Sequence, residues 1–164
     1  EAAQTQVVEA EAFLELSRPL ADAPTSALQC FLHQAMRGTA AESAGISVEE
    51  SDAEGVFFRW IATAGEFSRY VNGTMPRDFS PCGATVDGAR PLVMRSPERY
   101  YTYASQFHAP VRTVMLVPYR RGGKAVGTVW VAMHSQDRVF TRAELRFVEN
   151  LGNFPSDVLD SAGH

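Results

Sequence analysis

The spacing of apolar residues changes along the chain, and each spacing predicts a different element of structure. Apolar residues recur at helical spacing over residues 7–16, and two prolines then end that helix. A second helix is predicted to start at Ser26, which can cap it while Gln29 closes a capping box, and to end at Gly45. Its core face would be formed by Leu28, Phe31, Leu32, Ala35 and Met36.

After Gly45 the period changes to two, which is typical of strands. Residues 46–48 and 56–62 are predicted as two strands, and residues 51–55 as the hairpin loop between them. Residues 65–88 have no regular period, so we expect a long irregular segment there.

Residues 92–107 are predicted to hold a short strand and a helix. The strand covers residues 92–94, and Ser96-Pro97 supplies a serine cap and a proline at the first helical position. The helix would carry Tyr100, Tyr101, Ala104 and Phe107.

A long hairpin is the clearest unit of the sequence. Gly122-Gly123 lies between two apolar runs, residues 113–119 and 125–134, and such a turn requires positive φ angles. After it, Thr141 and Glu144 form a capping box for a final helix.

Two further signals frame that final helix. Phe140 and Leu145 occupy the positions of a hydrophobic staple across its first turn. Pro155 must stop or kink the helix.

The two faces of the run 125–134 differ in character. One is purely apolar and should lie under the terminal helices, whereas the other mixes a large aromatic ring with polar groups, as the floor of a pocket would. The first face holds Val129, Val131 and Met133, and the second holds Thr128, Trp130 and His134. Residues 114–117 are apolar on both faces and should be covered on both sides.

The order of these elements predicts an α+β domain. A central antiparallel sheet would carry the terminal helices on one face and a loop-and-helix lid over a pocket on the other.

Composition and charge exclude several classes of protein. With 164 residues, 45% hydrophobic and 21% charged, the chain is typical of a globular domain rather than a disordered segment. Its net charge of −4 argues against a nucleic-acid partner, and no apolar run approaches the roughly 18 residues that span a membrane. Two cysteines and no signal peptide predict the cytoplasm.

The histidines and cysteines have no spacing that predicts a metal site, and the sequence names no cofactor. Because the chain opens with Glu1, we expect a piece of a longer protein. We divide it into a helical lead-in at 1–24, a domain at 25–154 and a tail at 155–164 that leads to an output domain.

Two motifs resemble those of GAF domains. They are Met-Pro-Arg-Asp-Phe-Ser-Pro-Cys-Gly at residues 75–83 and Val-Gly-Thr-Val-Trp-Val at residues 126–131. More narrowly, the first motif followed by Pro-Glu-Arg-Tyr-Tyr at residues 97–101 is similar to GAF input domains of bacterial sensor histidine kinases. The resemblance covers about residues 26–151.

The resemblance implies a GAF-like, PAS-related sheet with a small-molecule pocket under the lid. It also implies a homodimer through the terminal helices and a covalently linked kinase or other output domain. It names no ligand, because Cys82 is followed by Gly83 instead of the histidine common in bilin-binding members. The motifs of phytochromes and of cyclic-nucleotide-binding members are also absent.

Cys82 has two interpretations. Ser80 as a cap and Pro81 as the first helical residue would place Cys82 at a helix N-terminus, which lowers a thiol pKa, with Arg77 close by. It would then be a reactive or ligand-attaching thiol. We favour the alternative, a small buried side chain, since free cysteine is among the most buried residue types.

Arg77 and Asp78 also have two interpretations, which are compatible. Arg77 could hold a ligand carboxylate or phosphate that Asp78 orients. We favour a structural role, in which a salt bridge and an Asx-turn make the long loop rigid.

The remaining candidate ligand-binding residues are mainly aromatic, and such walls suit an apolar or aromatic ligand better than a highly charged one. The candidates are Phe79, Tyr100, Tyr101, Trp130 and His134, with Trp60 as a second floor residue and Tyr103 and Phe107 on the lid. His134 is otherwise a partly buried residue at a strand edge.

The sequence is compatible with three alternative functions. The first is a sensory domain that binds a small molecule and biases its terminal helices without catalysis. The second is an enzyme similar to the free methionine-sulfoxide reductases of GAF fold, which would use Cys82 as its nucleophile. The third is a dimerisation module whose pocket is filled by its own Tyr100, Tyr101 and Trp130.

Overall fold

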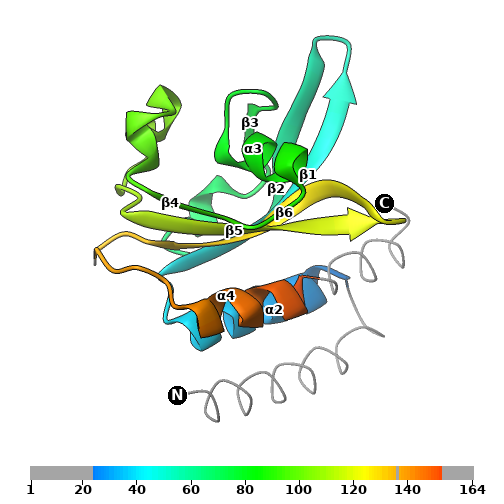
Figure 1. Cartoon of the computed structure of the whole chain (residues 1–164). Coiled ribbons are helices and arrows are strands. Elements are labelled where there is room, and N and C mark those ends of the chain that lie inside the picture. Colours follow the sequence, from blue (N-terminus) through cyan, green and yellow to red (C-terminus); the bar gives the residue numbers. More distant parts are fainter. Residues whose placement is uncertain (1–23, 136, 153–164) are drawn as a thin grey trace.

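A six-stranded antiparallel sheet lies at the centre of the computed structural model, which describes residues 24–135 and 137–152 (Figure 1). The strand order is β3-β2-β1-β6-β5-β4. The strands are β1 (Ser43–Asp52), β2 (Gly55–Gly65), β3 (Thr74–Pro76), β4 (Leu92–Arg95), β5 (Thr113–Arg121) and β6 (Lys124–Met133). The helix expected at residues 7–16, the tail at 155–164 and Pro155 lie outside the described residues.

Different kinds of helix cover the two faces of the sheet. On one face, α2 (Pro24–Thr39) packs on β1, β2 and β6, and α4 (Arg142–Leu151) packs on β5 and on α2. On the other face, α3 (Pro81–Gly88) lies over β5 and β6 (Figure 1). Three short 3-10 helices complete that layer, namely η2 (Ser68–Tyr70), η3 (Pro97–Arg99) and η4 (Thr102–Gln106). We call α3, these 3-10 helices and their connecting loops the lid. The predicted α+β architecture is confirmed.

The sheet therefore has two cores. The helix-side core lies between the sheet and helices α2 and α4, and the lid-side core lies between the sheet and the lid. Strand β5 contributes Met115 and Val117 to the first and Val114 and Leu116 to the second, so its predicted burial on both faces is confirmed.

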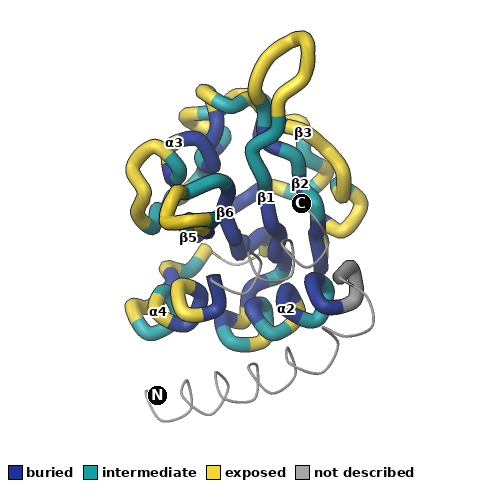
Figure 2. Tube along the Cα trace, turned by 90° about the vertical axis from the view of Figure 1, so that its right-hand side faces the viewer, coloured by how far each residue is buried: buried dark blue, intermediate teal, exposed yellow. Residues whose placement is uncertain are grey.

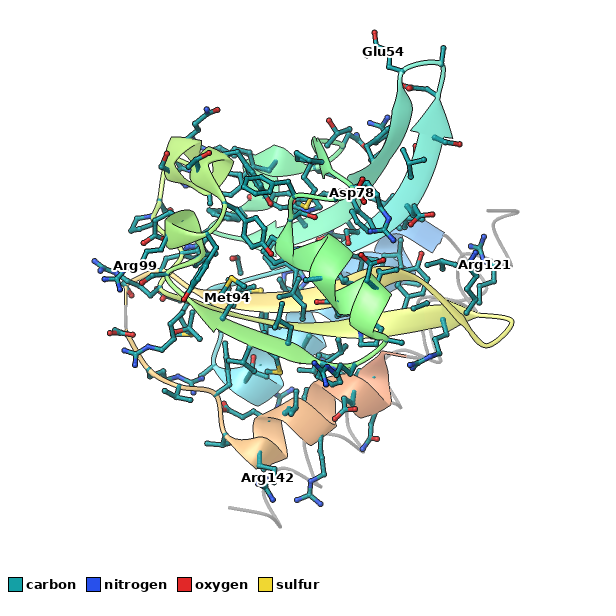
Figure 3. The ribbon with its side chains drawn as sticks, turned by 45° about the horizontal axis from the view of Figure 1, so that its top comes forward. Glu54, Asp78, Met94, Arg99, Arg121 and Arg142 are labelled. Carbon is teal, nitrogen blue, oxygen red and sulfur yellow. The ribbon has the colours of Figure 1, made fainter. Side chains whose placement is uncertain are left out.

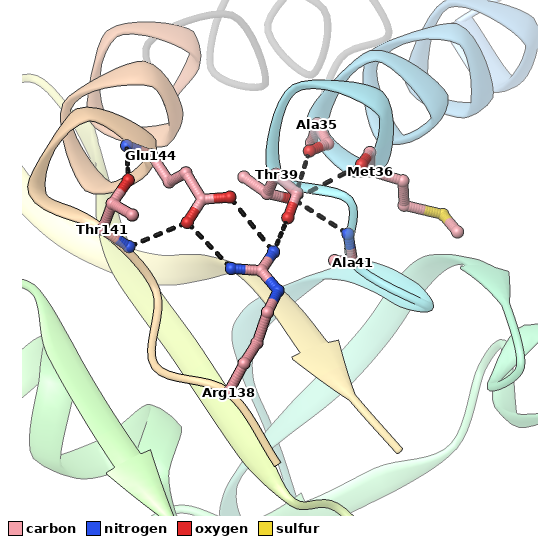
Figure 4. A network of polar contacts seen from close by, with 7 residues as sticks. All are labelled: Ala35, Met36, Thr39, Ala41, Arg138, Thr141 and Glu144. Carbon is pink, nitrogen blue, oxygen red and sulfur yellow. Dashed lines mark hydrogen bonds and ion pairs between the residues drawn. The ribbon is translucent and has the colours of Figure 1, made fainter. Parts of the chain in front are cut away.

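The predicted signals of the C-terminal third are also confirmed. Gly122 and Gly123 turn the β5–β6 hairpin with φ angles of 59° and 80°. Thr141 Oγ1 accepts a hydrogen bond from Glu144 N at 3.1 Å, and Glu144 Oε1 accepts one from Thr141 N at 2.8 Å. Figure 4 shows how this capping box extends to α2, because Arg138 bridges Glu144 and the carbonyl of Thr39 at the C-terminal end of α2.

Helix α2 corrects two predicted boundaries. The helix is already formed at Pro24, so Ser26 lies inside it and is not its cap. It ends at Thr39, where Ala40 takes a left-handed φ of 53°, and not at Gly45. Gly45 instead lies within β1, where a Cβ atom would come within 2.3 Å of the Trp130 ring. The glycine is explained by this close approach between neighbouring strands.

The first hairpin is longer than predicted. Ser51 pairs with Val56 and Asp52 with Gly55, so the strands extend into the expected loop. Asp52 Oδ1 closes the turn by accepting hydrogen bonds from the amides of Glu54 and Gly55. The exposed tip of this hairpin projects away from the sheet (Figure 2).

Two segments of the lid also differ from expectation. Residues 65–88 contain η2, β3 and α3, although their sequence shows no regular period. The helix expected after Ser96 is two 3-10 helices, because Tyr101 is extended at φ −129° and separates them. Ser96 has a positive φ of 50° and makes no side-chain capping bond.

Candidate functional site

A cavity lies between the lid and the sheet, inside the lid-side core. The cavity has a volume of about 50 Å³. Its walls are almost entirely apolar and carry no charged side chain. They consist of Trp60, Phe67, Met75, Pro81, Cys82, Pro97, Tyr103, Ala104, Phe107, Val111, Val114, Leu116, Trp130 and Ala132.

The floor of the cavity comes from the sheet. Alternation along β6 directs Trp130 and Ala132 to this side while Val129, Val131 and Met133 join the helix-side core. Trp60 of β2 reaches across β1 toward Trp130, with a distance of 5.1 Å between the ring centroids. Gly45 of β1 makes this possible, since it leaves room for Trp130 between the strands.

The roof comes from the lid, whose side chains are crowded against the sheet (Figure 3). Phe107 stacks on Trp60 at 5.6 Å between ring centroids, with an angle of 27° between the planes. Phe67 lies 4.9 Å from Phe107 and 6.1 Å from Trp60, so the three rings form one cluster. Cys82 of α3 and Ala104 of η4 close the roof beside them.

Two polar atoms of the walls lack a hydrogen-bond partner. They are the indole Nε1 atoms of Trp60 and Trp130, both inaccessible to solvent and both unpaired within the described part of the chain. Leaving such a buried donor unsatisfied costs about 1–3 kcal/mol. Tyr103 has only a long contact of 4.0 Å from its hydroxyl to Met75 Sδ, and burial raises the pKa of Tyr103.

Cys82 lies where the sequence predicts, in the first turn of α3. Ser80 caps this helix by accepting a hydrogen bond from Gly83 N at 3.1 Å, and Pro81 is the first helical residue. The low pKa that the reactive-thiol interpretation requires is not found, because complete burial raises the pKa of the Cys82 thiol despite its contact with Thr128 Oγ1 at 3.5 Å. The thiol is therefore protonated and enclosed, as in the favoured interpretation.

Arg77 has a structural role in the lid. Its guanidinium donates to Glu49 Oε2 of β1 at 2.6 Å and to Asp87 Oδ1 of α3 at 2.8 Å. The hydrogen bond with Asp87 raises the pKa of Arg77 and lowers that of Asp87. Asp78 lies 3.9 Å from Arg77 with its side chain 96% exposed, on the loop that leads into α3 (Figure 3). Neither Arg77 nor Asp78 lines the cavity.

Three of the aromatic candidates also lie outside the cavity wall. Phe79 and Tyr100 are 51% and 63% exposed, and Tyr101 is half-buried against Phe79 at 5.2 Å between ring centroids. Of the eight candidate ligand-binding residues, Cys82 and Trp130 line the cavity, and so do the additional floor residue Trp60 and the lid residues Tyr103 and Phe107.

His134 is buried and does not line the cavity. Its Nδ1 donates to the carbonyl of Pro110 at 2.8 Å, and its Nε2 forms a hydrogen bond of 2.6 Å with Ser43 Oγ. The ring also packs on Phe67 at 4.4 Å. His134 thus ties the end of β6 to the lid loop before β5.

Several wall residues were not predicted from the sequence. Phe67 and Met75 lie in the segment without a regular period, Pro97 is the first residue of η3, and Val111 lies in the loop between η4 and β5. The apolar character of Phe67 and Met75 within that polar segment is the only signal that could have indicated them.

Neither a metal site nor a membrane-spanning helix is found within the described residues, 24–135 and 137–152. No group of three or more histidine, cysteine, aspartate or glutamate residues within them is arranged to hold a metal ion. None of the helices within them has both the length and the apolar character that a membrane crossing requires.

Comparison with known proteins identifies the relatives of this fold. The family model of the GAF domain matches residues 5–154. A search of curated protein sequences found no match.

Three solved structures illustrate the similarity. The GAF domain from a phosphoenolpyruvate-protein phosphotransferase of Coxiella burnetii superposes with a TM-score of 0.84 at 15% identity, covering 99% of this chain and 96% of that chain. The free methionine-R-sulfoxide reductase from Neisseria meningitidis, solved with its substrate, has a TM-score of 0.73 at 12% identity, covering 99% and 92%. The chromophore-binding domain of Stigmatella aurantiaca bacteriophytochrome has a TM-score of 0.75 at 15% identity, covering 98% and 61%. At these identities the similarity shows a common fold.

Proposed function

This chain belongs to the GAF domain family, and on that basis we propose that it is a sensory domain that binds a small molecule between its sheet and its lid. GAF domains are common signalling and small-molecule-binding modules. The observation that carries the proposal is the apolar cavity, whose floor belongs to the same strands that support α2 and α4.

The strands give a direct mechanical route from the cavity to the helices. Trp130 of β6 lies in the cavity floor, while its neighbours Val129 and Val131 pack in the helix-side core. A ligand that moves Trp130 therefore acts on the surface that supports α2 and α4. It produces a signal only if it binds one arrangement of these helices better than another.

We further propose the context of the domain. It would act as a homodimer through its terminal helices, in the cytoplasm, and would control a covalently linked histidine kinase or other output domain. The motif at residues 75–83 followed by residues 97–101 supports a kinase, because this pair resembles sensor-kinase input domains.

Native mass spectrometry of the freshly purified chain tests this proposal. We expect a bound small molecule and a dimer, and we expect hydrogen exchange in α4 to change when the molecule is removed. A dimer that never carries or accepts a small molecule would instead support the ligand-free dimerisation module.

The second candidate function is sulfoxide reduction, suggested by the fold shared with the Neisseria meningitidis enzyme and by Cys82 in the cavity wall. The geometry favours it less. Cys82 is a buried, protonated thiol, and Cys30 packs against the helix-side core, on the opposite face of the sheet. The two sulfurs cannot form a disulfide without rearrangement of the fold.

An assay of free methionine-R-sulfoxide reduction separates the two functions. We expect no reduction by the wild type beyond that of Cys82→Ser. Turnover that the wild type supports and Cys82→Ser abolishes, with Cys30→Ser as the matched control, would establish the enzyme instead.

A further inference from the structure

The cavity wall determines which ligand the proposed site can take, and the attachment of the lid determines how that ligand enters. We propose that the cavity binds a small apolar molecule, such as a short hydrocarbon, without a hydrogen bond, and that this molecule enters beside the ring pair of Phe79 and Tyr101. Both parts rest on the proposed function, because they assume that the cavity is the ligand site.

The first argument is that the polar side-chain atoms of the wall are withheld from a ligand. The Nε1 atoms of Trp60 and Trp130 are inaccessible to solvent, and Trp130 Nε1 lies against Gly45 of β1. Cys82 is 2% exposed, and its thiol contacts the Thr128 hydroxyl on β6. The surface that faces the cavity is almost entirely apolar, so it gives a ligand dispersion contacts instead of hydrogen bonds.

The second argument is the absence of charge from the cavity wall. None of its residues is acidic or basic. The guanidinium of Arg77, in the loop that leads to α3, is already paired with Glu49 and Asp87. A carboxylate or an ammonium group would therefore lose its hydration without gaining a counter-ion, and an uncharged polar group would lose its hydrogen bonds with water.

The third argument is size. A volume of about 50 Å³, at roughly 10–15 Å³ for each water-sized group, holds roughly three to five non-hydrogen atoms. Water competes poorly for this space, because a buried water requires roughly two to four polar partners. A hydrocarbon of this size requires none and gains by leaving water.

The route of entry follows from how residues 97–107 are held. Within the described part of the chain, their backbone hydrogen bonds join them to one another and to the adjacent Ser96. The segment is tied at its two ends, where Ser96 N donates to Arg112 O at 3.0 Å and His108 N donates to Tyr70 Oη at 2.8 Å. Between these ends it is held over the cavity by side chains.

One ring pair closes the outside of this segment. Phe79 and Tyr101 are 5.2 Å apart between ring centroids, with an angle of 77° between the planes. Phe79 precedes Pro81 and Cys82 of the cavity wall, and Tyr101 precedes Tyr103 of the same wall, but neither ring of the pair lines the cavity. The pair therefore bridges the two segments that form the roof, and separating it opens the roof without breaking a backbone hydrogen bond.

The chain supplies matched reporters for the test. Met75 and Ala132 line the cavity, whereas Met115 and Ala62 lie in the helix-side core. With carbon-13 in the methyl groups of methionine and alanine, methyl spectra therefore show on which face of the sheet a probe binds.

Three probes of nearly equal shape separate the ligand classes. The full labelled chain is titrated with isobutene, with acetone, in which oxygen replaces a methylene, and with acetate, in which a charged oxygen also replaces a methyl group. We expect isobutene to shift the signals of Met75 and Ala132 and not those of Met115 and Ala62. It should bind at least about tenfold more tightly than acetone, whose oxygen loses its hydrogen bonds with water, and acetate should not bind.

Each other outcome overturns a defined part of the proposal. Binding of acetone or acetate as tight as that of isobutene would overturn the apolar class, and shifts at Met115 and Ala62 would place the site in the wrong core. If no probe binds while native mass spectrometry shows a bound molecule, the inference fails and the proposed function survives. If neither method shows binding, both fail.

Matched enlargements test the location in a second way. Ala132 and Ala62 are 1% and 3% exposed, on opposite faces of the sheet. Ala132→Val should abolish isobutene binding, and Ala62→Val should retain it. Retained binding in Ala132→Val would show that the molecule lies elsewhere.

Exchange broadening of the methyl signals tests the entrance, because it gives the rates of binding and release. Phe79→Ala and Tyr101→Ala should each raise both rates by about 2–10-fold, as the loss of one ring pair allows, and leave the Kd unchanged. Tyr100→Ala is the control, since Tyr100 is 63% exposed in the same segment and should leave both rates unchanged. If neither Phe79→Ala nor Tyr101→Ala changes the rates, or if they raise the Kd alone, the entrance is not at this pair.

Discussion

The two faces of the sheet share the same strands and yet carry cores of different construction. The helix-side core is largely aliphatic and is covered by two regular α-helices. The lid-side core is rich in aromatic rings and sulfur atoms and is covered by short helices and loops. Since β5 and β6 serve both cores, the difference comes from what covers them. Regular helices place side chains at even spacing and fill the interface, whereas a few large rings held by short elements leave a cavity.

This comparison places the more completely filled core on one face of the sheet and the proposed ligand cavity on the other. The first prediction tests it with the same truncation on both faces. Phe147 of α4 is 1% exposed in the helix-side core, and Phe107 is half-buried in the cavity wall. We expect Phe147→Ala to lower the free energy of unfolding by about 3–5 kcal/mol, and Phe107→Ala by about 1–2 kcal/mol.

Urea denaturation followed by circular dichroism measures both losses. Equal m-values across the variants serve as the control for comparable unfolded states. Equal losses of stability from the two truncations would contradict the division of labour between the cores.

Local sequence signals predicted the elements that depend on local interactions. The capping box of Thr141 and Glu144 and the Gly122-Gly123 turn are formed as expected. Ser80 and Pro81 also start α3 where their residue types indicate. In each case the interacting atoms lie within a few residues of one another, so the sequence contains the whole interaction.

The errors arise where distant segments decide the outcome. Gly45 has the sequence signal of a helix end, yet it is required because Trp130 packs against it from another strand. Likewise, the position of Cys82 at a helix N-terminus suggests a low pKa, and burial beneath the lid has the larger effect. The residue type favoured burial of Cys82, but that burial outweighs the effect of the helix N-terminus only because the lid folds over it.

The candidate site was only partly predicted, again because contacts between distant segments decide which residues line it. Alternation along β6 indicated Trp130 as a floor residue. The exposure of Tyr100 and the engagement of Arg77 by Glu49 and Asp87 depend on how the lid folds over the sheet. No local pattern in residues 65–111 reports that arrangement.

The second prediction adds a methyl group on each face. A Cβ on Gly38 would lie 2.2 Å from Phe147 Cε1, and a Cβ on Gly45 would lie 2.3 Å from Trp130 Cζ2. In the filled helix-side core the ring has little room, so Gly38→Ala should cost about 1–3 kcal/mol, partly offset by the helix propensity of alanine. Gly45→Ala should cost about 1 kcal/mol, because Trp130 can move into the cavity.

The tryptophan signals distinguish these two cases. Gly45→Ala should change the tryptophan emission, because it displaces the Trp130 ring, whereas Gly38→Ala should leave the emission unchanged. If Gly38→Ala alters the fluorescence as much as Gly45→Ala, the two cores are not independent.

The third prediction concerns Glu42, which joins the strands that both cores share. Its carboxylate accepts hydrogen bonds from the amides of His134 and Ser135 and from the Ser135 hydroxyl. Burial alone would raise the pKa of Glu42, but these hydrogen bonds lower it from 4.5 to about 2. Because the folded pKa lies below the unfolded one, the carboxylate stabilises the fold above pH 4.5 and loses this effect as the pH falls toward 2.

Glu42→Gln should therefore lower the free energy of unfolding by about 1–2 kcal/mol at pH 7, a value reduced for partial exposure. The difference from the wild type should decrease steadily between pH 4.5 and pH 2. Denaturation curves at a series of pH values give this profile, and a difference that stays constant down to pH 2 would show that the hydrogen bonds do not depend on the charge.

The smallest expected effect on stability concerns the ion pairs that hold the lid. If the lid is to admit a ligand, it must be held to the sheet more weakly than α2 and α4 are. Asp87 and Asp78 both face Arg77, at 2.8 Å and 3.9 Å, and both are exposed. Solvent screens such pairs, so Asp87→Asn should lower the free energy of unfolding by about 0.5 kcal/mol or less at low salt and should not change it near 1 M salt. Asp78→Asn should not change it at either salt concentration.

Loss of the ion pair between Arg77 and Asp87 should nevertheless increase acrylamide quenching of the tryptophans in Asp87→Asn, because Asp87 lies on α3, which covers the cavity. Unchanged quenching would mean that Glu49, which also holds Arg77, is sufficient to keep the lid closed.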